Sequence, residues 1–80
     1  MKIEPLRILG IDPCTNVTGF GLVEIRNNKP VILDMGMITP KRGLMHYDRI
    51  KVLHEESLKI VEKYQPDVMA IEAPFFGKDI

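Results

Sequence analysis

The spacing of apolar and polar residues predicts most of the elements of this chain. Residues 7–12 are a short, mostly apolar run that ends on Asp12, which is typical of a buried strand. Residues 19–26 alternate with a period of two and predict a second strand, and residues 31–39 predict a third. Between these two, residues 27–29 predict a hairpin turn, because asparagine tolerates a positive φ.

The third predicted strand has two faces, because successive side chains of a strand point to opposite sides. One face is expected to carry Val31, Leu33, Met35 and Met37. The other face is expected to carry Ile32, Asp34, Gly36 and Ile38. The proline and glycine that follow, Pro40 and Gly43, end this strand.

A helical period replaces the period of two in the second half of the chain. Apolar side chains from Tyr47 to Tyr64 fall on one stripe, which predicts an amphipathic helix over residues 44–64. Pro66 ends this helix, because proline biases the residue before it away from the helical backbone. Residues 68–71 then predict a fourth strand, buried by its apolar composition, which runs directly into Glu72.

An acidic residue stands at the end of the first and of the fourth predicted strand, and the predicted fold decides whether the two can meet. The order of elements predicts an α/β fold with a mixed sheet. Three antiparallel strands come first, and the helix returns the chain so that the fourth strand runs parallel to the first. This strand adds beside the first or beside the third. Beside the first, at a strand spacing of about 4.8 Å, it would bring Asp12 and Glu72 within reach of one cation. Carboxylate oxygens suit Mg²⁺ or Mn²⁺.

Each of these acids also has a simpler interpretation. Asp12 precedes a proline, and Asp-Pro is a common opening of a turn. Glu72 can be an exposed strand terminus, although a glutamate directly after an apolar strand is seldom placed there for stability. The two acids together favour a metal site.

Composition narrows the class of protein only slightly. The 80 residues allow one small domain, and equal numbers of basic and acidic residues, 11 of each, give no bulk signal for nucleic acid. The single cysteine excludes an internal disulfide and fits a reducing compartment. No apolar run approaches the roughly 20 residues that cross a bilayer, so we expect a soluble, cytoplasmic protein with no membrane partner.

The segments "ILGIDP", "VTGFG" and "YQPDVMAIEAPFFGK" resemble the N-terminal half of the RuvC-type Holliday junction endonucleases. The likeness runs over about residues 8–79, and "IEAPFFGK" is most similar to the form found in Bacteroidetes-type bacteria. The resemblance implies an RNase H-like fold and a homodimer that makes paired, Mg²⁺-dependent cuts in four-way DNA junctions. It also implies a possible complex with a branch-migration helicase.

The resemblance implies roles for individual residues. Asp12 and Glu72 would be the first two catalytic carboxylates and would ligate Mg²⁺ in a two-metal hydrolysis. Phe75, with Phe76 beside it, would stack on bases near the crossover, and Lys78 would contact a phosphate. In this interpretation the glycines that flank Phe20 are packing positions.

The chain departs from the family pattern in two respects. Cys14 stands where the family normally has a glycine that allows a tight turn beside the metal. The family also has further acidic residues and a fifth strand in its C-terminal half, which these residues do not contain. Residues 1–80 are therefore expected to be the N-terminal part of a single RNase H-like nuclease domain, a truncated fragment that is inactive by itself.

Two other functions remain open from the sequence. "GIDPCTNVTGFG" resembles the first phosphate loop of actin-like ATPases and sugar kinases, and binding of ATP without affinity for junction DNA would favour such a lobe. A non-catalytic interaction module would instead use Phe75, Phe76 and the open edge of the fourth strand to pair with another chain.

Overall fold

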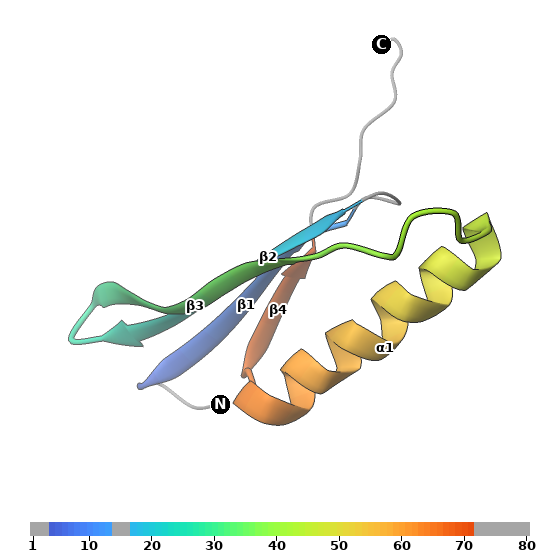
Figure 1. The fold of residues 1–80 in the computed structure, drawn as a ribbon. Helices are drawn as coiled ribbons and strands as arrows, with labels where there is room; N and C mark the ends of the chain where they lie inside the picture. Colours follow the sequence, from blue (N-terminus) through green and yellow to red (C-terminus); the bar gives the residue numbers. More distant parts are fainter. Residues whose placement is uncertain (1–3, 14–16, 72–80) are drawn as a thin grey trace, which may run out of the picture.

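A four-stranded mixed sheet with one helix forms the structure, a computed structural model that describes residues 4–13 and 17–71 (Figure 1). The strands before the helix are β1 (Leu6–Asp12), β2 (Thr18–Arg26) and β3 (Lys29–Ile38). The later elements are α1 (His46–Tyr64) and β4 (Val68–Ile71). The strand order is β3-β2-β1-β4, with β4 parallel to β1 and the other pairs antiparallel. The fourth strand therefore adds beside the first, which is the arrangement that the metal-site hypothesis needs.

The turn between β2 and β3 forms where the sequence predicts it. Asn27 and Asn28 have φ values of 52° and 62°, so both central residues of this two-residue turn are left-handed. Such a turn matches the right-handed twist of the flanking strands. Pairing resumes at once, since Lys29 lies opposite Arg26 and already belongs to β3.

A β-bulge in β3 corrects the predicted faces of that strand. Leu22 lies opposite Asp34 but Val23 lies opposite Ile32, so Leu33 is an extra residue with no partner of its own in the register. An extra residue reverses the alternation on one side of the bulge. Val31 therefore shares a face with Asp34, and the prediction that it shares one with the two methionines of β3 is wrong.

The hydrophobic core lies on the face of the sheet that α1 covers (Figure 1). Leu9 of β1 and Leu22 of β2 lie opposite each other there and are fully buried, and Ile38 is buried as well. The other face of the described sheet carries exposed apolar side chains, of which Met37 is 76% exposed. We call this second side the open face.

The end of the helix follows the prediction, and its start differs slightly. Gln65 is left-handed, with φ of 48°, and its N–H donates to the carbonyl of Val61 before Pro66 stops the helix. The helix begins at His46, two residues later than expected. No helix in the described ranges is long and apolar enough to cross a membrane.

The prediction that the fourth strand is buried is wrong for the described part of the chain. All four residues of β4 are exposed, and Ile71 is 59% exposed. β4 is the outer strand of the described sheet, so it pairs with β1 on one side only. Composition alone could not distinguish an apolar edge strand from an apolar central strand.

Candidate functional site

Asp12 is the last residue of β1, where its side chain is exposed and lies opposite Gly19 of β2. The parallel strand β4 ends on Ile71, which lies opposite Ile11. The C-terminal ends of β1 and β4 therefore meet at one edge of the sheet, where sites of α/β proteins usually form. Glu72 follows Ile71 directly in the sequence but lies outside the described residues, as do Cys14, Phe75, Phe76 and Lys78.

A shallow hollow of about 420 Å³ adjoins Asp12 on the open face of the sheet. No residue of α1 lines it. Its lining comes from β1, β2 and β4 and consists of Gly10, Ile11, Asp12, Gly19, Gly21, Ala70 and Ile71. The hollow therefore joins the carboxylate at the end of β1 to the end of β4.

Packing does not require the glycines of β2 that line this hollow. A Cβ added at Gly19 or Gly21 would meet no heavy atom of residues 4–13 and 17–71 within 4 Å. By contrast, a Cβ added at Gly36 would lie 3.0 Å from the ring of Phe20, so packing does require that glycine. Within the described residues, the interpretation of the two glycines flanking Phe20 as packing positions is therefore wrong. A glycine inside a strand often marks a place where a ligand or another backbone approaches closely.

Carboxylate chemistry and an open hollow beside it fit a hard divalent cation. Asp12 offers two oxygens at an exposed strand end, and Mg²⁺ in proteins is bound by one or two carboxylates, several waters and substrate phosphates. Among residues 4–13 and 17–71, no group of three or more histidine, cysteine, aspartate or glutamate residues could hold a metal. Asp12 would therefore act together with ligands outside the described ranges.

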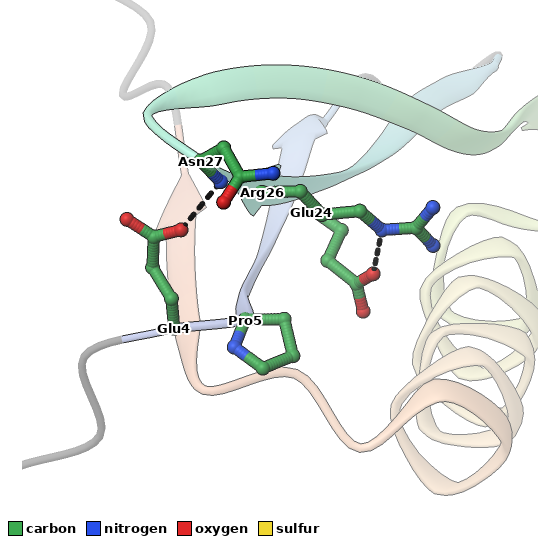
Figure 2. Close-up of a pocket in the computed structure, with 5 residues that line it drawn as sticks. All are labelled: Glu4, Pro5, Glu24, Arg26 and Asn27. Carbon is green, nitrogen blue, oxygen red and sulfur yellow. Dashed lines mark hydrogen bonds and ion pairs between the residues drawn. The ribbon is translucent and has the colours of Figure 1, made fainter.

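A polar cluster lies at the opposite end of the strands from Asp12. The carboxylate of Glu24 is buried, with the residue 5% exposed, and accepts hydrogen bonds from Arg7 Nε at 2.9 Å and Arg26 Nε at 2.5 Å. Figure 2 shows the second of these bonds, together with the bond from the Asn27 N–H to Glu4. The sequence analysis missed this cluster, although charged residues inside otherwise apolar strands were a signal for it.

These two arginines hold the pKa of Glu24 below its ordinary value of 4.5, and the hydrogen bond from Arg7 has the larger effect. A lowered pKa stabilises the folded state fully above the ordinary value, and this stabilisation is lost as the pH falls through the lowered pKa. We expect Glu24→Gln to flatten the dependence of stability on pH below about 4.5. Thermal unfolding of both proteins at a series of acidic pH values measures this, and parallel curves would contradict it.

The C-terminus of α1 is tied to the sheet by a second set of polar contacts. The hydroxyl of Tyr64 donates to the carboxylate of Asp34 on β3, and the backbone carbonyl of Tyr64 accepts from Arg7 Nη1 at 2.7 Å. The hydrogen bond from Tyr64 lowers the pKa of Asp34. The sequence assigned Tyr64 to the apolar stripe of the helix, and its hydroxyl shows why a tyrosine stands there.

Three antiparallel strands, a helix and a fourth strand parallel to the first have the arrangement of an RNase H-like domain, and here a carboxylate stands at the end of β1. The family model described as crossover junction endodeoxyribonuclease RuvC matches residues 8–80. The chain therefore belongs to the RuvC family.

Individual relatives agree with the family assignment. A crossover junction endodeoxyribonuclease RuvC from Bacteroides fragilis is 42% identical over 81 residues, covering 98% of this chain and 43% of that protein. The chain thus spans less than half the length of this relative. The resemblance to the Bacteroidetes form is confirmed.

Solved structures confirm the predicted fold class. Thermus thermophilus RuvC in complex with a Holliday junction substrate superimposes with a TM-score of 0.79 at 22% identity, over 91% of this chain and 47% of that one. A Ppx/GppA-family protein from Aquifex aeolicus also superimposes, with a TM-score of 0.64 at 16% identity, over 82% of this chain and 25% of that one. The fold alone therefore does not select a chemistry, and the assignment to a family rests on the sequence match.

Proposed function

We propose that the chain is the N-terminal part of a metal-dependent endonuclease that resolves four-way DNA junctions in recombination and repair. The observation that carries this proposal is the position of Asp12, which ends β1 beside the parallel strand β4 in a chain that matches the RuvC family over residues 8–80. The register of the two strands, continued by one residue past Ile71, would pair Glu72 with Asp12. Both carboxylates would then hold Mg²⁺, or Mn²⁺ in its place.

The residues around this edge would divide the work of binding and hydrolysis. A bound divalent ion would polarise the scissile phosphate and lower the pKa of the attacking water. Asp12 and Glu72 would supply the negative charge that holds the ion, and the glycine-lined hollow would admit the DNA backbone beside them. Phe75 and Phe76 would stack on bases, and Lys78 would contact a phosphate.

The complete protein would supply what these residues lack. We expect further carboxylate ligands, a homodimer that presents two sites to one junction, and a possible complex with a branch-migration helicase in the cytoplasm. Residues 1–80 alone should cut little or no DNA, because two carboxylates hold a metal pair poorly.

Cleavage of a synthetic four-way junction, compared with a linear duplex of the same sequence, tests the proposal. With Mg²⁺ the complete protein should cut the junction and leave the duplex intact, and a chelator should stop the reaction. Saturable binding of ATP together with no affinity for junction DNA would overturn the proposal in favour of a nucleotide-binding lobe.

A further inference from the structure

Arg7, near the start of β1, contacts β2, α1 and the residue that leads into β4. Its Nε donates to Glu24 of β2 at 2.9 Å, and its Nη1 donates to the carbonyl of Tyr64 at the end of α1 at 2.7 Å. The backbone N–H and carbonyl of Arg7 form hydrogen bonds with Asp67, the residue directly before β4. The entry of β4 into the sheet is therefore fixed at this end.

Arg7 and Asp67 form a reciprocal pair of hydrogen bonds. The N–H of Asp67 donates to the carbonyl of Arg7 at 2.9 Å, and the N–H of Arg7 donates to Asp67 Oδ2 at 2.9 Å. In a pair of parallel strands, the N–H of Arg7 would ordinarily donate to a backbone carbonyl that comes earlier in the neighbouring strand. Here Gln65 is left-handed and ends the helix, so the carboxylate of Asp67 takes the place of that carbonyl.

The spacing along the two strands connects this pair to the candidate metal site. Arg7 lies five residues before Asp12, and Asp67 lies five residues before Glu72. A slip of one residue in the pairing of two strands moves every side chain of the slipped strand to the other face. The described part of β4 has four residues and all are exposed, so few of their side-chain contacts oppose such a slip.

We propose that Asp67 is a positioning residue for the metal site, and this inference rests on the proposed function. The hydrogen bond from the Arg7 N–H to the Asp67 carboxylate sets the register of β4 against β1, so that the end of β4 at Ile71 lies beside the end of β1 and Glu72 would follow next to Asp12. Asp67 itself does not touch the metal, since it lies at the opposite end of the strand pair.

The affinity of the complete protein for Mn²⁺, measured by calorimetry alongside the melting temperature, tests this role. Asp67→Ala removes the acceptor and should weaken Mn²⁺ binding by about 10-fold or more, the usual cost of losing a group that orients metal ligands. Asp67→Asn keeps an oxygen that can accept from Arg7 and should restore most of the affinity. Asp34→Ala is the matched control, because it removes the helix anchor at Tyr64 without touching β4.

Asp34→Ala should lower the melting temperature and leave Mn²⁺ affinity close to that of the wild type. Equal losses of affinity in Asp34→Ala and Asp67→Ala would overturn the inference, because they would reflect a general loss of stability in the fold.

Wild-type affinity in Asp67→Ala would also overturn the inference. The proposed function would still stand in that case if Asp12→Asn lost its affinity for Mn²⁺. If Asp67→Ala does not fold, the Mn²⁺ affinity of Asp67→Glu tests the inference instead. This variant displaces the carboxylate by one methylene, so it should bind Mn²⁺ more weakly than the wild type, and wild-type affinity would overturn the inference. Failure of the wild-type protein to bind Mn²⁺ would instead contradict the proposed function.

Discussion

Asp12→Asn is expected to abolish Mg²⁺-dependent junction cleavage by the complete protein, with a loss on the order of 10³-fold or more. Asparagine has almost the same size and shape as aspartate but carries no charge. The substitution therefore removes the negative ligand that compensates a divalent cation and leaves the backbone of β1 unchanged. Cleavage of a labelled four-way junction, measured under single-turnover conditions, gives this ratio directly.

The folded state and the binding of DNA should survive this change. Asp12 is exposed, so the melting temperature of Asp12→Asn should match that of the wild type. Asp48→Asn is the matched control, because Asp48 is an exposed aspartate in the first turn of α1 and does not line the hollow beside Asp12. Cleavage by Asp12→Asn within a few-fold of the wild type would exclude a metal-binding role for this carboxylate.

Gly19→Val has the second largest expected effect, a loss of about 10²-fold in junction cleavage. Residues directly opposite each other in an antiparallel pair carry their Cβ atoms about 5 Å apart on the same face. A valine at position 19 would therefore stand beside Asp12 in the hollow and obstruct the approach of a DNA backbone. A misplacement of about 1 Å near a reacting group can cost about 10²-fold.

Stability should not explain this loss. A Cβ at Gly19 meets none of the described residues within 4 Å, and valine favours strands, so the melting temperature should stay the same or rise. Met37→Val is the matched control, because Met37 lies opposite Gly19 on β3, is 76% exposed and does not line the hollow. Wild-type cleavage by Gly19→Val would show that the hollow is not where DNA approaches.

Local signals in the sequence predicted most of the fold. The turn at Asn27 and Asn28 and the end of the helix at Gln65 depend on backbone preferences of single residues, so they could be predicted from short stretches. The end of β1 on Asp12 followed from the point where the apolar run stops. The helix between β3 and β4 then restricted the direction of the last strand.

Features that depend on contacts between distant residues could not be predicted. The bulge at Leu33 changes no residue type in β3 and is visible only in the pairing with β2. The exposure of all four described residues of β4 differs from the burial that their apolar composition predicted, although the order of elements had indicated an open edge on this strand. The contact between Arg7 and Asp67 joins residues 60 positions apart, so no local pattern could indicate it.

The candidate site was predicted in part. The sequence identified Asp12 and the edge at which β1 and β4 end together, and the structure bears out that geometry. The family resemblance implied that Gly19 and Gly21 are packing positions, and the structure instead shows open space beside both among the described residues. A sequence cannot show whether space exists beside a glycine. The roles of Glu72 and of the aromatic pair after it stay predictions, since these residues lie outside the described ranges.

A crystal structure of the complete protein soaked with Mn²⁺, with the metal located by its anomalous scattering, tests the central claim most directly. The account predicts an anomalous peak at the C-terminal edge of β1 and β4, with carboxylate oxygens of both Asp12 and Glu72 at about 2 Å from the metal. Mn²⁺ bound elsewhere, or a peak at this edge that only one of the two carboxylates ligates, would contradict it.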